Sequence, residues 1–367
     1  MDLKRLTISV ANVLKGTKTL DALVDDLRTF PELAIFDNKL QWKGGPGVVW
    51  SLRLLGEWLE SRARNVGASE AVRDVERYVT TTAIPYEEIL ILAGVALTKR
   101  IRLTGGIELI PFSQLPATVW KEHVEELFGK SWANYRPSVA LRRASKRPRI
   151  HTDRDPEVRW HAEFQRLDDV RLCITALGPH APLYLEAWIQ APNWVPEIGG
   201  SAQIPEPLNV GNYPRNVVAD LHGLTQLHKK WVGLNEAERN RLRVALKRIN
   251  SGLRRLDRVD FAIDLGTAME AIFLSDKEPE QGELAFTLRL RAARYLASNK
   301  GQRQEISKIF LHLYRLRSKA VHTGELKPIE ARISTESALS RGYQLVTQAI
   351  RRIITQGKPD WSEMIFH

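Results

Sequence analysis

The chain has 367 residues, of which 43% are hydrophobic and 26% are charged. This composition is ordinary for a folded globular protein and argues against disorder throughout the chain. The formal net charge of +11 favours contact with polyanions such as RNA or DNA, although a charge excess does not by itself prove binding.

No stretch of the sequence is apolar for long enough to predict a membrane span. The best candidate, residues 89–97, is about half the required length. The N-terminal residues Met1 to Arg5 lack the apolar core of a signal peptide. The basic residues are spread over many segments, which argues against one cationic membrane-surface helix. We therefore expect a cytoplasmic protein with no membrane partner.

The chain begins with a region that is predicted to be mainly helical. Apolar residues recur at helical spacing from residue 1 to about residue 64, and residues 71–80 are also predicted to be helical. The apolar run at residues 89–98 fits either a short strand or a buried helix, because periodicity alone does not separate the two. Both alternatives stay open for this run.

The next segments are predicted to be strands. Residues 100–111 alternate between polar and apolar types on both sides of Gly105 and Gly106, which is typical of a β-hairpin. Residues 170–175 and 183–189 are predicted to be two further strands. The first half of the chain is therefore expected to mix helices and strands.

The chain has one cysteine, Cys173, so an intrachain disulfide is excluded. It lies in the alternating apolar run of residues 170–174. We interpret it as a buried strand residue and not as a nucleophile.

A basic run lies between the hairpin and the later strands. Residues 141–154 contain six lysines and arginines against one acidic residue. Such a run is usually a solvated loop, and a nucleic-acid contact is the alternative. The nearby His151, His161, Asp153 and Asp155 do not match a known metal-ligand spacing. We therefore predict no metal site.

Residues 201–233 are rich in proline and glycine over much of their length and are interpreted as a connector. The connector divides a mixed α/β N-terminal domain, residues 1–200, from a helical domain, residues 234–367. The role of the N-terminal domain is open, with a sensor or regulatory role as one hypothesis. The fold class is thus α+β.

The helical domain is predicted to contain five amphipathic helices. Asn235 begins the first, with Glu238 as its capping-box partner. Short connections between long helices are typical of an antiparallel bundle. The other four helices are predicted from about 259 to 274, from 284 to 297, from 302 to 322, and from a cap at Ser334 or Thr335.

One stretch of the fourth of these helices carries residues suited to phosphodiester chemistry. Arg317 is followed by Ser318, and His322 stands at the predicted helix end before Gly324. An arginine can hold a phosphate with two parallel donors, and a histidine can move a proton near neutral pH. The alternative is structural: Arg317 paired with Glu270 at the surface, and His322 stabilised by the helix dipole.

Three successive segments together resemble a HEPN domain, in particular its Apea-like branch. They are residues 261–274, 286–293 and 314–324, and the likeness covers roughly residues 234–356. The resemblance implies an antiparallel helical bundle with the activity of a metal-independent endoribonuclease, in which two protomers bring their Arg/His pairs into one cleft. The chain departs from the common pattern at Ser318, where asparagine is frequent, and at Thr323, which separates His322 from the glycine.

The resemblance also implies roles for individual side chains. Arg317 is expected to anchor the scissile phosphate, and His322 to act as general acid or base. Ser318 is expected to orient the phosphate or His322. The expected product is a 2′,3′-cyclic phosphate, and no cofactor is expected.

Four further residues could assist Arg317 and His322, either by contact with their side chains or by contact with RNA. Asp264 and Glu270 could hold Arg317 or the imidazole, and only one of them is expected to face that way. Arg315 and Lys319 are candidates for RNA contacts, with solvated side chains as the alternative.

The spacing of Arg317 and His322 limits what one chain can do. Residues five apart on an ideal helix lie about 140° apart, so the two side chains do not form a neighbouring pair on one face. A helix end at His322 or a second protomer could bring them together, and a twofold dimer would place both copies about one axis. We therefore expect RNA as the partner and a homodimer formed through the bundle.

Two functions from different classes stay open. The first is an RNA-cleaving HEPN protein that serves as a toxin or antiviral defence effector and is held in check by its N-terminal half. The second is a non-catalytic HEPN-like module that binds RNA, a nucleotide or a protein partner.

Overall fold

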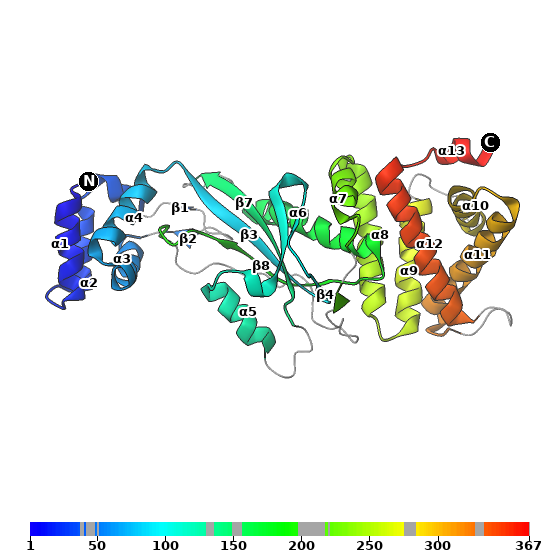
Figure 1. Cartoon of the computed structure of the whole chain (residues 1–367), viewed down its shortest axis with the longest axis horizontal. Coiled ribbons are helices and arrows are strands. Elements are labelled where there is room, and N and C mark those ends of the chain that lie inside the picture. The colour runs from blue at the N-terminus through cyan, green and yellow to red at the C-terminus, as the bar shows by residue number, and fades with distance from the viewer. Residues whose placement is uncertain are drawn as a thin grey trace.

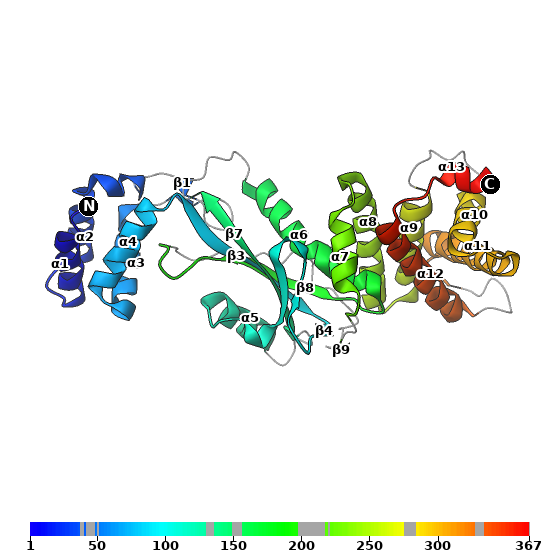
Figure 2. The ribbon, with the colours of Figure 1, turned by 45° about the horizontal axis from the view of Figure 1, so that its top comes forward.

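Three groups of elements follow one another along the long axis of the computed structural model, with the two termini at opposite ends (Figures 1 and 2). N-terminal helices come first, a five-stranded sheet lies in the middle, and a helical bundle ends the chain, so the fold is α+β as predicted. Within the described residues, no helix is long and apolar enough to cross a membrane. The structure describes residues 1–36, 40–41, 48–49, 51–129, 136–148, 156–196, 217–218, 221–274, 284–326 and 334–366.

The helical prediction for the N-terminal region is confirmed. Side chains of Asp2, Thr19 and Ser51 cap three of the helices by accepting hydrogen bonds from backbone N–H groups in the first turn. Leucines and a valine at helical spacing are buried in one hydrophobic core: Leu23, Val24, Leu27, Leu52, Leu55 and Leu59. The elements are α1 (Leu3–Leu14), α2 (Leu20–Arg28), η1 (Pro31–Phe36), the strand pair β1 (Leu40–Gln41) and β2 (Val48–Val49), α3 (Leu52–Val66) and α4 (Ala68–Thr80).

The central sheet has the strand order β5-β6-β7-β3-β8, and its neighbouring strands are antiparallel. The predicted hairpin is confirmed, with a short first strand and the glycine pair in the turn. The ambiguous run at 89–98 is mostly strand: residues 89–93 belong to one strand and residues 95–96 to another. The elements are β3 (Ala83–Ala93), β4 (Val95–Ala96), β5 (Ile101–Arg102), η2 (Thr104–Gly106), β6 (Ile107–Pro111), η3 (Phe112–Gln114), β7 (Val139–Pro148), β8 (Leu183–Gln190) and β9 (Val217–Val218), which pairs with β4 in parallel.

Two helices cover opposite faces of the sheet. Helix α5 (Val119–Gly129) packs Val124 and Phe128 against one face. Helix α6 (Pro156–Leu177) packs against the other face, which belongs to the larger hydrophobic core. Figures 1 and 2 show the sheet between these two helices.

The prediction of a strand at residues 170–175 is wrong, because these residues lie inside α6. Residues 167–176 are all buried, so this part of the helix has no polar face and its sequence shows no helical stripe. Cys173 is buried as predicted, but in a helix, and burial raises the pKa of its thiol well above the usual value.

The basic run at 141–154 is not a solvated loop over the part that the structure describes. Residues 141–148 belong to strand β7, and residues 149–154 lie outside the described residues. Arg142 stands directly opposite Glu108 of β6, and Arg143 stands directly opposite Glu88 of β3. These cross-strand carboxylates neutralise the arginines, which explains why a charged segment lies within a sheet.

All five predicted helices of the C-terminal bundle are present. Asn235 and Glu238 form the predicted capping box, and Ser334 caps the last predicted helix. One helix, α7, lies in the range that we interpreted as a connector; residues 201–216 of that range lie outside the described residues. The helices are α7 (Leu224–Val232), α8 (Glu236–Arg254), α9 (Arg258–Phe273), α10 (Leu284–Leu296), α11 (Lys300–Thr323), α12 (Thr335–Gln356) and α13 (Trp361–Phe366).

Helix α6 joins the sheet to the bundle. It contacts β3 on one side and α7, α8 and α12 on the other. A buried hydrogen-bond network crosses this boundary: Asn250 of α8 donates to Thr175 Oγ1 at 2.9 Å and to the Pro182 carbonyl at 3.1 Å, and it accepts from Arg171 Nη1 at 3.2 Å. The sheet and the bundle therefore share one core.

We predict that Asn250→Ala lowers the free energy of unfolding by about 2–4 kcal/mol, because it removes three hydrogen bonds and leaves buried polar groups without them. Urea unfolding followed by circular dichroism measures the change. The matched control is Asn193→Ala at an exposed position, where we expect a change within about 0.5 kcal/mol. Equal effects of the two substitutions would contradict the structural role of the network.

Candidate functional site

The residues that carry the predicted site lie in the last turns of α11. Leu313, Leu316 and Ala320 are buried on the side that packs against the bundle. The helix ends at Gly324, whose φ of 66° is left-handed and whose N–H donates to the Ala320 carbonyl at 3.0 Å. The predicted helix end is therefore confirmed.

Arg317 reaches from α11 to α9. Its Nη2 donates to Glu270 Oε2 at 3.3 Å, and each of the two side chains is 30% exposed. An ion pair with this exposure is worth about 1 kcal/mol or less, so it orients the guanidinium more than it stabilises the fold. Arg317 Nε is buried and has no hydrogen-bond partner among the described residues.

Gly266 of α9 makes room for the stem of Arg317. A Cβ atom at Gly266 would lie 2.3 Å from Arg317 Cγ and 2.8 Å from Arg317 Cβ, distances at which the helices would have to move apart. Sequence reasoning missed this residue. The available signal was a glycine inside a helix, which costs about 1 kcal/mol relative to alanine and so calls for a packing reason.

The two acidic candidates have different environments. Asp264 is 2% exposed and accepts hydrogen bonds from Arg248 Nη1 and Arg255 Nε, both at 3.2 Å. Glu270 contacts Arg317 instead. As expected, only one of the two acids faces Arg317, and it is Glu270.

The remaining predicted site residues lie around this contact. His322 is exposed in the last turn of α11, and Arg315 is exposed about two turns before it. Ser318 and Lys319 are half-buried, and Ser318 forms no hydrogen bond with Arg317 or His322 in the described part of the chain. The expected orienting role of Ser318 therefore has no contact to support it within one protomer.

One protomer thus presents a guanidinium group and an imidazole group near the same helix end. Glu270 forms an ion pair with the guanidinium group of Arg317, and the imidazole group of His322 is exposed to solvent. A spacing of five residues turns the two side chains about 140° apart around an ideal helix. The described residues contain no group of three or more His, Cys, Asp or Glu side chains that could hold a metal ion.

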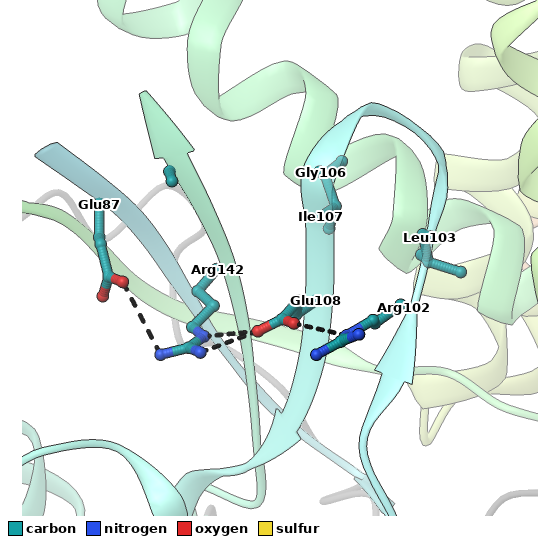
Figure 3. A pocket seen from close by; sticks show the side chains of 8 residues that line it. Glu87, Arg102, Leu103, Gly106, Ile107, Glu108 and Arg142 are labelled. Carbon is teal, nitrogen blue, oxygen red and sulfur yellow. Dashed lines mark hydrogen bonds and ion pairs between the residues drawn. The ribbon is translucent and has the colours of Figure 1, made fainter. Parts of the chain in front are cut away.

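A separate hollow of about 350 Å³ lies on the α5 face of the sheet and is also lined by arginines. Figure 3 shows Arg142 between Glu87 and Glu108, with Arg102 beyond Glu108. Arg142 donates to Glu108 Oε2 at 2.8 and 3.0 Å, and Arg102 donates to Glu108 Oε1 at 3.1 Å. These bonds, with that of Arg142 foremost, hold the pKa of Glu108 below its usual value. The carboxylates neutralise the guanidinium groups, so this hollow is poorly suited to an anionic ligand.

Comparison with known proteins assigns no family to the chain. No family model, no curated protein and no solved structure matches it.

We predict opposite effects for two identical glycine substitutions. Gly266→Ala should lower the free energy of unfolding by about 1–3 kcal/mol, because the new methyl group would overlap Arg317. Gly301→Ala, in the first turn of α11, meets only Asn299 Oδ1 at 3.6 Å and should raise stability by up to about 1 kcal/mol. Urea unfolding measures both, and a stabilising Gly266→Ala would contradict the close approach of Arg317 to α9.

Proposed function

We propose that helices α8 to α12 form a HEPN-type endoribonuclease that cleaves RNA without a metal ion. The observation that carries the proposal is the mutual packing of α9, α10 and α11, with Arg317 and exposed His322 in the last two turns of α11. Such an activity would suit a toxin or antiviral defence effector held in check by its N-terminal half.

The packing of the three HEPN-like segments supports this proposal. They occupy α9, α10 and α11 in that order, and these three helices contact one another. The close approach of α11 to α9 brings the arginine of the third segment to an acid of the first. The residues that carry the resemblance are thus neighbours in space as well as in sequence order.

The chemistry follows from the properties of these two side chains. Arg317 binds the scissile phosphate and stabilises the negative charge that develops on its oxygens. His322 accepts the proton of the ribose 2′-hydroxyl, and the 2′-oxygen attacks phosphorus as the bond to the 5′-oxygen breaks. A protonated histidine returns a proton to that leaving oxygen. The products are a 2′,3′-cyclic phosphate and a 5′-hydroxyl.

A second copy of the chain would complete the site. Within one protomer Arg317 and His322 are turned about 140° apart on the helix, so the arginine of one copy and the histidine of the other would have to meet at one phosphate. A twofold axis near the end of α11 would bring two Arg317 and two His322 side chains to one cleft. We therefore include a homodimer formed through the bundle in the proposal.

One observation favours a second candidate function. Arg317 is only 30% exposed and already contacts a carboxylate, which suits a structural arginine in a non-catalytic module that binds RNA, a nucleotide or a protein partner. In that case the end of α11 would bind without cutting.

A cleavage assay separates the two functions. We expect the purified protein to cut mixed single-stranded RNA in the presence of EDTA and to leave single-stranded DNA intact, because DNA lacks the attacking 2′-hydroxyl. His322→Ala and Arg317→Ala should each lower the cleavage rate at least about 100-fold.

The matched control is His222→Ala, which removes another exposed histidine in the turn before α7 and should leave the rate unchanged. Arg317→Lys should not restore full activity, because a lysine keeps the charge but loses the two-pronged donors. RNA that binds but is never cut by the dimer would support the non-catalytic function. Cleavage that EDTA abolishes would contradict the metal-independent mechanism.

A further inference from the structure

A second cavity lies where the sheet meets the bundle. It has a volume of about 580 Å³ and is bounded by the hairpin turn, β7, α6, α7 and the start of α8. This volume is within the range of small-molecule sites and is far larger than a lone inorganic ion requires. Neither Arg317 nor His322 lines it.

Four arginines contribute to its wall, and three of them are paired with a carboxylate. Arg143 donates to Glu88 at 2.6 and 2.7 Å, and Arg243 donates to Asp169 twice at 2.8 Å. Arg239 donates to Glu236 at 2.6 and 3.1 Å. The fourth arginine is Arg166, which is exposed and has no carboxylate partner among the described side chains. Among the described side chains, the wall therefore carries one guanidinium without a carboxylate partner.

The three carboxylates are not equally fixed. The side chains of Glu88 and Asp169 are 0% and 8% exposed, and breaking a buried pair by removing one partner costs about 3–5 kcal/mol. Glu236 is 59% exposed, and an exposed pair is worth about 1 kcal/mol or less. An incoming anion would therefore displace Glu236 and leave the other two carboxylates in place.

Displacement of Glu236 would free donors of two arginines at once, since it accepts from Arg243 Nη1 at 2.5 Å as well as from Arg239. Glu236 is also the first residue of α8, a 19-residue helix whose N-terminus favours negative charge. With Arg166, these groups make a position suited to a phosphate, which guanidinium groups bind strongly.

The remaining wall is aromatic and partly polar. Trp231 and His228 of α7 are 1% and 2% exposed, and Ile107 lies beside them in the cavity wall. Trp231 Nε1 and His228 Nδ1 have no hydrogen-bond partner in the part of the chain that the structure describes. Burial lowers the pKa of His228 and so favours the neutral imidazole, which has one donor and one acceptor nitrogen. This wall suits a ring that carries both donors and acceptors.

We propose that this cavity binds a nucleoside phosphate, with the phosphate on Arg166 and Arg239 and the base against the wall formed by Trp231 and His228. When no ligand is bound, the carboxylate of Glu236 occupies the place where the phosphate would bind. The site is distinct from Arg317 and His322, so it does not depend on RNA cleavage.

Isothermal titration calorimetry of the full chain at low ionic strength tests the proposal. The probes are the 5′-monophosphates of adenosine, guanosine and uridine, with the corresponding nucleosides and inorganic phosphate for comparison. We expect at least one monophosphate to bind about tenfold more tightly than its nucleoside and than inorganic phosphate, a difference of about 1.4 kcal/mol.

Three variants locate the site. Arg166→Ala should weaken binding at least about tenfold, and Glu236→Gln should tighten it, because the competing charge is gone. The matched control Arg241→Ala removes an arginine of α8 that does not line the cavity and should bind as the wild type does. Arg317→Ala should also leave binding unchanged.

Three results would overturn the proposal. They are the absence of binding by all three monophosphates up to about 10 mM, wild-type affinity in Arg166→Ala, and weaker binding in Glu236→Gln. Arg166 and Glu236 are exposed, so both variants are expected to fold, which circular dichroism checks.

Discussion

The burial of residues 167–176 of α6 between the sheet and the bundle is the constraint on which the rest of the structure depends. This part of the helix has no polar face toward water, so its charged residues must find partners inside the protein. Asp168 pairs with Arg171 at 2.5 Å within the helix, and Asp169 pairs with Arg243 of α8. The second of these contacts joins α6 to the first half of α8, and the arginine-lined cavity lies at this junction.

The sequence predicts the bundle well and the centre of the molecule less well, for a physical reason. A bundle helix exposes one face, so its apolar stripe and its caps, such as Asn235 with Glu238, can be recognised locally. Helix α6 has no such stripe, and periodicity does not distinguish it from a buried strand. The arginines of β7 are neutralised by Glu88 and Glu108, which lie far away in sequence, so a local reading mistakes the strand for a loop.

The same limit applies to the candidate site. The sequence predicts the helix end at Gly324, and it also predicts that only one of the two acids meets Arg317. For the catalytic hypothesis it leaves Glu270 and Asp264 open, whereas the structural alternative names Glu270 as the partner of Arg317, and this pair is present. The choice between the two acids depends on which side of α9 packs against α11. That packing in turn depends on Gly266, whose missing side chain lets the stem of Arg317 pass. The roles of Arg317 and His322 in RNA cleavage, and the homodimer, remain proposals.

The central claim is that Arg317 and His322 form half of a site that two protomers share. Mixing Arg317→Ala with His322→Ala protomers tests it most directly, because a mixed dimer keeps one arginine and one histidine in the shared cleft. The account predicts that the mixture regains RNA cleavage that neither variant has alone, in proportion to the mixed dimers counted by native mass spectrometry. Mixed dimers that form but remain as inactive as the parent variants would contradict it.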